Sequence, residues 1–218
     1  MTTGVAPVLG VLAGVVAVAD TIPYVRDTLR GTTRPHRGTW LIWGVLATVV
    51  CISQRADGAS WSLIMAGAQA VVTCLVWVLS IRRGEGGVGV GEVIMVGVAM
   101  GGVVGWIVAD EPIVATACVV AADLIGAAMM VPKTWRAPDS ETLSTYAFAS
   151  VGGALAAGAV GGLDPALLLY PIYYCVVNAA ISGLIVHRRR VFRETPVVSN
   201  ASPEGSRVRR PTAPAVSR

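Results

Sequence analysis

Polar side chains are rare within the long apolar runs of this sequence, and those that occur there are the residues best able to do chemistry. Asp123 stands deep in one such run. A carboxyl group inside lipid costs at least about 2.5–3.5 kcal/mol, so Asp123 should face a cavity, face a partner or hold a proton. Gln69, Thr73 and Asn178 bring hydrogen-bonding groups into two further runs. Such groups can bind a polar solute, and they can equally hold neighbouring helices together.

Asp20 lies in another apolar run and Pro171 in the same run as Asn178, and each leaves two interpretations open. Asp20 is nearer the end of its run, where it has a functional role or simply approaches the headgroups or an arginine of the next loop. Pro171 removes a backbone hydrogen bond, which creates either a hinge or a static kink. The tyrosines beside it, Tyr170, Tyr173 and Tyr174, are expected to pack within the protein or to form an outer aromatic belt.

The motifs of hydrolases, metalloenzymes and nucleotide-binding proteins are absent from the sequence or stand in the wrong context. The glycine-rich segment GEGGVGVGE at 84–92 follows an apolar run rather than a strand, which predicts a flexible loop and not a phosphate site. His36 and His187 both lie beside basic clusters, so we expect them at the membrane surface. The sequence therefore predicts no enzyme, no cofactor and no metal site.

The composition indicates a chain that is embedded in lipid. Hydrophobic residues make up 54% of the 218 residues and charged residues only 14%, and the mean hydropathy is +0.67. Soluble domains carry about 25% charged residues, and a chain of this length could not bury so much apolar surface in its own core. The cysteines lie in the apolar runs without a CxxC pair, so we do not expect a disulfide framework.

Hydropathy predicts seven membrane spans of about 20 residues, the length needed to cross a bilayer. They cover residues 4–23, 39–55, 61–81, 92–109, 112–131, 143–161 and 165–186. The runs lack the alternation of barrel strands, so the predicted fold class is an all-α integral membrane protein with seven transmembrane helices. The first run ends in the cleavage-like Ala17-Val18-Ala19, but no Lys or Arg precedes Arg26, so we expect a retained helix.

The positive charges indicate one orientation in the membrane. Every Lys and Arg except Arg55 falls in the connections after the first, third and fifth spans or in the C-terminal segment. The positive-inside rule places these segments in the cytoplasm, with the N-terminus outside the plasma membrane. The net charge of +4 is then a consequence of topology, and we do not expect a nucleic-acid partner.

The two halves of the chain resemble each other at a constant offset. In a second possible alignment of the two halves, the residues before the first basic loop are shifted by three positions. The sequence does not decide between the two alignments. The aligned pairs at the constant offset are Asp20 and Asp123, Pro35 and Pro138, Thr39 and Thr142, and Trp43 and Tyr146.

Two three-helix units in one chain can be parallel only if a further span separates them, because three spans invert the chain. The fourth predicted span has no counterpart in the repeat and can fill that role. We therefore predict two parallel three-helix repeats at 4–83 and 112–190, a linker helix at 92–109 and a disordered cytosolic tail at 192–218.

This 3+1+3 layout resembles the SWEET and PQ-loop superfamily of membrane transporters, and bacterial PnuC-type vitamin transporters share the architecture. The family signature is a proline near the cytosolic end of the first helix of each repeat, followed by a basic segment. The stretches IPYVRDTLRGTTRP, which contains Pro23, and MMVPKTWRAPDSETLS look like degenerate versions of that signature.

The resemblance implies an alternating-access transporter or facilitator that binds a small polar solute between the repeats, near mid-membrane. In the family, an asparagine on a third helix and aromatic residues on a second helix contact the solute. Asn178 matches the first role, Gln69 or Thr73 stands in its place in the other repeat, and Trp43 and Tyr146 match the second role.

The remaining candidates concern movement and partners. Pro23, Pro171 and Trp40 are candidates for a hinge or gate, since each stands where a helix kinks or meets the cytosolic interface. The expected partners are the lipid bilayer and a solute such as a sugar, vitamin or amino acid, and a homo-oligomer stays open. The alternative function is a non-transporting membrane receptor or scaffold.

Overall fold

The structure, a computed structural model, describes residues 5–56, 61–109 and 112–194. Within these ranges the chain is built of α-helices and one short 3-10 turn, η1, and forms no β-sheet. The elements are α1 (Val5–Ala19), α2 (Thr21–Arg30), α3 (Arg37–Ala56), α4 (Trp61–Arg83), α5 (Val90–Val108), α6 (Pro112–Arg136), η1 (Pro138–Ser140), α7 (Leu143–Ala159) and α8 (Pro165–Glu194). Each of the predicted spans falls on a helix. The predicted tail lies almost entirely at 195–218, outside the described residues.

Four of the described helical segments are long and apolar enough to cross a membrane. They are Val5–Arg30, Val90–Val108, Thr116–Arg136 and Leu167–Glu194. α7 is apolar but shorter. The all-helical class is therefore confirmed, while the count of seven spans stays a prediction.

The first of these segments is interrupted near its middle. Val5–Arg30 is helical over 26 residues, and the boundary between α1 and α2 falls at Asp20. Pro23 explains the interruption, because a proline cannot donate a backbone hydrogen bond to the carbonyl four residues earlier, here that of Ala19. The helix continues well past residue 23, the predicted end of the span, so Asp20 lies inside the segment rather than near its end.

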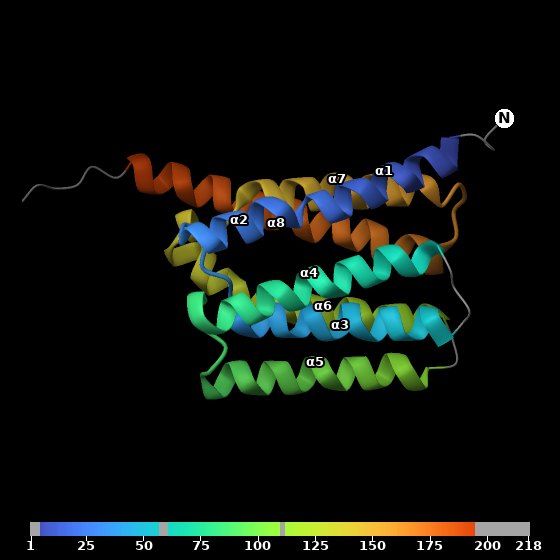
Figure 1. Cartoon of the computed structure of the whole chain (residues 1–218), viewed down its shortest axis with the longest axis horizontal. Helices are drawn as coiled ribbons and strands as arrows, with labels where there is room; N and C mark the ends of the chain where they lie inside the picture. The colour runs from blue at the N-terminus through green and yellow to red at the C-terminus, as the bar shows by residue number, and fades with distance from the viewer. Residues whose placement is uncertain (1–4, 57–60, 110–111, 195–218) are drawn as a thin grey trace, which may run out of the picture.

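The helices pack in a closed ring with one helix outside it (Figure 1). Following the contacts, α1 packs against α7, α7 against α8, α8 against α6, α6 against α3, α3 against α4, and α4 against α1 and α2. α5 lies against α6 and α3 on the outer side. Glycine allows the closest of these approaches, since a Cβ atom on Gly153 of α7 would stand 2.6 Å from the backbone nitrogen of Cys175 on α8.

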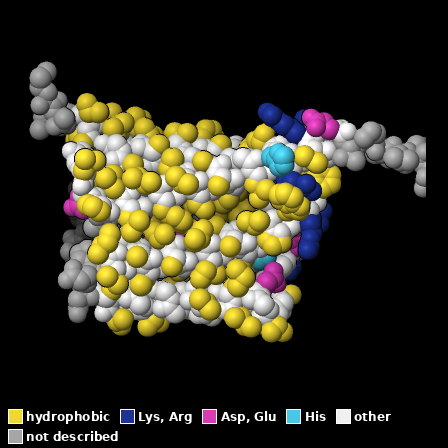
Figure 2. Space-filling view, turned by 180° about the vertical axis from the view of Figure 1, so that it is seen from behind, with side chains coloured by type: hydrophobic (Ala, Val, Ile, Leu, Met, Phe, Trp, Pro, Cys, Tyr) yellow, Lys and Arg dark blue, Asp and Glu magenta, His cyan; other side chains and the backbone are white. Residues whose placement is uncertain are grey.

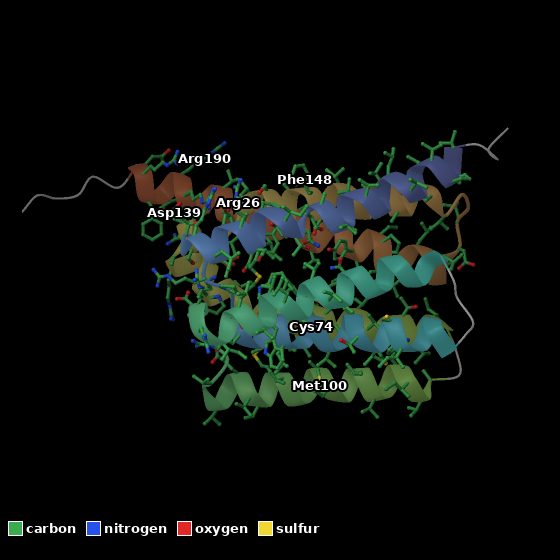
Figure 3. The ribbon with its side chains drawn as sticks, in the orientation of Figure 1. Arg26, Cys74, Met100, Asp139, Phe148 and Arg190 are labelled. Atoms are coloured by element: carbon green, nitrogen blue, oxygen red, sulfur yellow. The ribbon has the colours of Figure 1, made fainter. Side chains whose placement is uncertain are left out.

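Charged side chains collect at one end of the ring, called here the basic end. Figure 2 shows the Lys and Arg side chains gathered there, next to the C-terminal end of α8, while the flank of the molecule is largely hydrophobic. In Figure 3, Arg26, Asp139 and Arg190 lie at this end, and Cys74 and Met100 lie midway along the helices. The distribution is the one that the sequence-based topology requires.

The segment between α4 and α5, predicted to be a flexible loop, is anchored to the start of α3 at the basic end. The backbone N–H of Glu85 donates to the carbonyl of Pro35, and the N–H of Arg37 donates to the carbonyl of Glu85. Gly86 and Gly87 have φ of 67° and 81°, a conformation that favours glycine. This segment thereby ties α5 to the ring.

His36 is buried at this junction, so the prediction that it lies at the membrane surface is wrong. Its Nδ1 accepts a hydrogen bond from the backbone N–H of Thr39, which leaves Nε2–H to donate to Glu92 on α5 at 2.9 Å. Burial lowers the pKa of His36 from 6.5, against the opposing influence of the Glu92 carboxylate. The neutral ring therefore joins the start of α3 to α5. His187, in contrast, is exposed as predicted.

Candidate functional site

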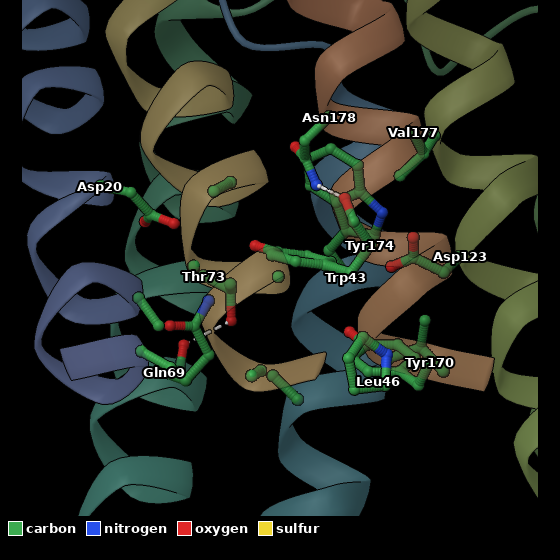
Figure 4. A pocket seen from close by; sticks show the side chains of 18 of the residues that line it. Asp20, Trp43, Leu46, Gln69, Thr73, Asp123, Tyr170, Tyr174, Val177 and Asn178 are labelled. Carbon is green, nitrogen blue, oxygen red and sulfur yellow. Dashed lines mark hydrogen bonds between the residues drawn. The ribbon is translucent and has the colours of Figure 1, made fainter. Parts of the chain in front are cut away.

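The ring surrounds a partly open cavity of about 720 Å³, within the range of about 300–1,000 Å³ typical of small-molecule sites. Every helix of the ring contributes to its wall, and α5 adds Trp106. Figure 4 shows the cavity from close by, with polar side chains entering it from several helices. The cavity is the natural candidate for a binding site in this fold.

The cavity brings together nearly all of the residues proposed from the sequence to bind a solute or to act as hinge or gate. Among these, Pro23 is the exception, since it lies on α2 and is not part of the wall. Those that line the cavity are Trp40, Trp43, Gln69, Thr73, Asp123, Tyr146, Pro171 and Asn178. Their solute-binding role stays a prediction, but their common location is a structural fact.

Asp123 reaches the cavity from α6. Its side chain is buried, with 8% of the residue exposed, and the hydroxyl of Tyr173 on α8 donates to its Oδ2 at 2.7 Å. Tyr173 was expected to pack within the protein or to belong to an outer belt, and the structure adds this hydrogen bond to the carboxyl group. One carboxyl oxygen is thus engaged by a neighbouring helix, and the group as a whole faces the cavity (Figure 4).

Asp20 is a second buried carboxyl on the cavity wall, and it was not among the leading sequence candidates. It is 3% exposed, and the hydroxyl of Thr21 donates to its Oδ1 at 2.7 Å. Figure 4 shows Asp20 and Asp123 entering the cavity from opposite walls. The repeat alignment, which pairs Asp20 with Asp123, was the signal that could have identified it.

The neutral polar residues of the wall are partly engaged with their own helices. The side-chain amide of Asn178 donates to the carbonyl of Tyr174 at 2.8 Å, and the hydroxyl of Thr73 donates to the carbonyl of Gln69 at 2.8 Å. These bonds leave the side-chain oxygen of Asn178 to accept from a solute. Asn178 and Thr73 are each 5% exposed, so their contacts with a solute would be shielded from bulk water.

Two polar groups on the cavity wall lack hydrogen bonds within the described residues. They are Nε1 of Trp43 and Oγ1 of Thr145, both buried. Buried polar atoms in native proteins are nearly always paired, so such exceptions call for an explanation. Both atoms are shielded from the cavity, and Nε1 of Trp43 would stand 3.1 Å from a Cβ atom on Gly126 of α6, so these two groups do not by themselves indicate a ligand.

A hydrogen-bonded cluster, called here the Glu141 network, lies at the basic end of the cavity. Nζ of Lys133 donates to Oε1 of Glu141, and the hydroxyls of Tyr24 and Tyr146 donate to Oε2 at 3.1 and 2.9 Å. Nε1 of Trp40 donates in turn to the hydroxyl of Tyr24 at 3.1 Å. The carboxylate is thus fully occupied, as a buried ion pair requires.

The same network joins opposite parts of the ring. Tyr24 and Trp40 belong to α2 and α3, whereas Lys133 and Tyr146 belong to α6 and α7. Trp40 and Tyr146 also line the cavity, so the network forms its boundary on the basic side. The sequence signal for Lys133 and Glu141 was weak, because they belong to a short mixed-charge stretch that follows the fifth predicted span and resembles an ordinary solvated connection.

The described residues contain no group of three His, Cys, Asp or Glu side chains that could hold a metal ion. The length and apolar character of four of the described helices are compatible with a helical membrane protein. Comparison of the chain with family models, curated proteins and solved structures finds no match.

Proposed function

We propose that the chain is an alternating-access transporter or facilitator for a small polar solute. The observation that carries the proposal is the cavity itself, a chamber of about 720 Å³ into which a set of polar and aromatic side chains projects from a wall of mostly small and aliphatic residues. Helices that only needed to pack in lipid would fill this space with aliphatic side chains. Transporters, in contrast, keep their substrate site near the membrane midplane between helical units.

The order of the helices supports a construction from two parallel three-helix repeats with α5 as linker. In one set α4 packs between α1–α2 and α3, and in the other α8 packs between α6 and α7. The first helix of each set also contacts the second helix of the other set, as α1 does α7 and α6 does α3. A two-fold relation along the membrane normal would produce this pattern, and it is the 3+1+3 arrangement that the resemblance to SWEET and PQ-loop proteins implies.

Matched side-chain contacts support the same construction. Thr48 on α3 contacts the sulfur of Cys74 on α4 at 3.6 Å, and Ser150 on α7 contacts the sulfur of Cys175 on α8 at 3.6 Å. In each set a hydroxyl of the second helix thus meets a cysteine of the third. If the Thr48–Cys74 and Ser150–Cys175 contacts are equivalent, the two sets of helices are related, and the solute site lies in the cavity between them.

The Glu141 network gives the proposed transporter a closed side. It connects the two repeats at the basic end, which the positive-inside rule assigns to the cytoplasm, with the N-terminus outside. The structure would then correspond to a state closed toward the cytoplasm of a plasma-membrane protein. Transport would require this network to open while the opposite end closes, with Trp40 as part of the gate and Pro23 and Pro171 as hinges.

Substitutions in the cavity wall test the proposal. Solutes that raise the melting temperature of the purified protein are assayed for uptake into proteoliposomes by the wild type and by Asp123→Asn, Asn178→Ala and Asp164→Asn. We expect the first variant to lower uptake about tenfold and the second about three- to tenfold, because each removes a solute contact. Asp164→Asn is the matched control, since Asp164 lies outside the cavity wall and caps the start of α8. Unchanged uptake in both cavity variants would remove this site.

A non-transporting receptor is the alternative, and the same assay separates the two. A receptor would bind a solute in the cavity, and both cavity variants would weaken that binding, yet the solute would not accumulate in sealed vesicles. If every solute that raises the melting temperature of the protein fails to enter the vesicles, the chain is a receptor and the transporter proposal is wrong.

A further inference from the structure

The cavity wall carries negative charge without any positive charge to balance it. Asp20 and Asp123 are its ionisable acids, and no Lys, Arg or His is among the described residues that line it. The buried ammonium of Lys133 is not available as a counter-ion for these acids. It is paired with Glu141 and also donates to the backbone carbonyls of Arg34 and Ser140. Two buried carboxyl groups without a counter-ion must either hold protons or meet a cation.

Several aromatic rings also lie on the wall, among mostly small and aliphatic residues. Trp40 and Trp43 stack edge to face with centroids 5.2 Å apart, and Tyr170 and Tyr174 stack with centroids 5.8 Å apart. These rings line the cavity together with Trp106 and Tyr146. Aromatic faces attract ammonium and guanidinium groups through their quadrupole, and most strongly where water is excluded. They give no comparable attraction to an anion.

The side-chain oxygen of Asn178 offers a hydrogen-bond acceptor on the same wall. Asn178 is 5% exposed and lines the cavity, and its amide already donates to the carbonyl of Tyr174. The oxygen can accept from an N–H or O–H group of a ligand. This acceptor suits a ligand that carries a hydrogen-bond donor besides its charge.

We infer that the cavity binds a small organic cation, such as a hydroxylated ammonium compound or a guanidinium compound, with Asp20 and Asp123 as its counter-ions and the aromatic rings as its cage. This inference rests on the proposed function, since it names the substrate class of the proposed transporter. Neutral sugars would leave both carboxyl groups without a counter-ion, and anionic solutes would add repulsion from them. A cation satisfies the charge and the rings at once, and one that also carries a hydrogen-bond donor suits the oxygen of Asn178.

Pairs of cations and uncharged analogues of the same shape test the inference directly. Choline is compared with the alcohol in which a quaternary carbon replaces its nitrogen, and ethylguanidinium is compared with ethylurea. The melting temperature of the detergent-purified protein is followed as each compound is titrated to about 10 mM, since a ligand of the native state raises this temperature by mass action. We expect at least one cation to stabilise the wild type at a concentration about tenfold or more below its neutral analogue.

Neutral variants of the two acids locate the effect. Asp20→Asn and Asp123→Asn are each expected to weaken binding of the stabilising cation about tenfold or more, while Asp164→Asn leaves it unchanged. Neutral analogues that stabilise as well as the cations, cations that bind equally well to both variants, or no cation-specific stabilisation in either pair would overturn the inference. The comparison within the wild type stands even if a variant fails to fold.

The failure of this inference differs from the failure of the proposed function. If a neutral solute is the one that binds and is taken up into proteoliposomes, the transporter stands and the cation is wrong. If choline or ethylguanidinium binds in an Asp20- and Asp123-dependent manner but never crosses the membrane, the cation site stands and the transporter is wrong.

Discussion

Replacing Glu141 with alanine is expected to lower the free energy of unfolding by about 3–5 kcal/mol, the usual cost of leaving one partner of a buried ion pair alone. The substitution would strand the ammonium of Lys133, whose side chain is 6% exposed, and would take the acceptor away from the hydroxyls of Tyr24 and Tyr146. Reversible unfolding of the purified protein in mild detergent and denaturant measures the effect.

A surface ion pair of the same chain provides the matched control for this prediction. Arg34 and Glu85 approach to 3.6 Å, but their side chains are 61% and 34% exposed. Glu85→Ala should therefore cost only about 0–1 kcal/mol, because water solvates the arginine left behind. Equal losses for Glu141→Ala and Glu85→Ala would contradict the account of the Glu141 network as a buried, structurally important junction.

Replacing Gly153 with alanine is expected to lower the melting temperature sharply or to prevent folding. The added Cβ would stand 2.6 Å from the backbone nitrogen and 2.9 Å from the Cα of Cys175, so α7 and α8 would have to separate. Backbone atoms cannot move aside as a flexible side chain can, and such overpacking costs about 1–3 kcal/mol or more. The melting temperature in detergent is the readout.

Gly183 of α8 is the control for this second prediction, since a Cβ there meets no atom within 4 Å. Alanine is the better helix former by about 0.5–1 kcal/mol, so Gly183→Ala should be neutral or slightly stabilising. The two substitutions are chemically identical and are expected to act in opposite directions. A Gly153→Ala variant as stable as the wild type would mean that α7 and α8 do not approach as closely as described.

The helices and the basic end could be predicted because both depend on local composition. A run of about 20 apolar residues indicates a membrane helix wherever it lies in the chain, and the arginines mark the segments that stay out of the bilayer. Asp123 was identified for the same reason, since a carboxyl deep in such a run stands out. Its role in binding is still a prediction, and only its place on the cavity wall is structural.

The role of Asp20 was less visible because the end of its helix could not be read from hydropathy. The segment that follows it, from Tyr24 to Arg30, is polar enough to resemble a loop. In the structure it is α2, and it stays helical with Tyr24 buried and bonded into the Glu141 network. A stabilising contact between Tyr24 and Glu141, far apart along the sequence, leaves no trace in either local segment.

His36 illustrates the same limit. Its arginine neighbours predict a residue at the water interface, and only the fold brings Glu92 to its ring, while the adjacent Arg37 bonds the carbonyls of Glu85 and Gly86. Periodicity and charge report on how a helix meets lipid and water. They do not report which polar side chains pair with one another at the helix ends.

The central claim is that the cavity opens alternately to the two sides, and a cross-link at the basic end tests it without a known solute. The hydroxyls of Thr33 and Thr142 lie 2.6 Å apart and join the two proposed repeats there. Cysteines at both positions can form a disulfide that holds this end closed. The native cysteines are replaced by alanine, and Thr73→Cys places a reporter thiol on the cavity wall.

The measurement is the rate at which a charged, membrane-impermeant thiosulfonate modifies the reporter thiol from each face of sealed proteoliposomes. Before the cross-link forms, we expect modification from both faces. After it forms, modification from the face of the basic end should stop, while modification from the opposite face continues, and a reductant should restore the first pattern. Modification from the basic face at the same rate with and without the cross-link, or never from that face, would contradict alternating access through this cavity.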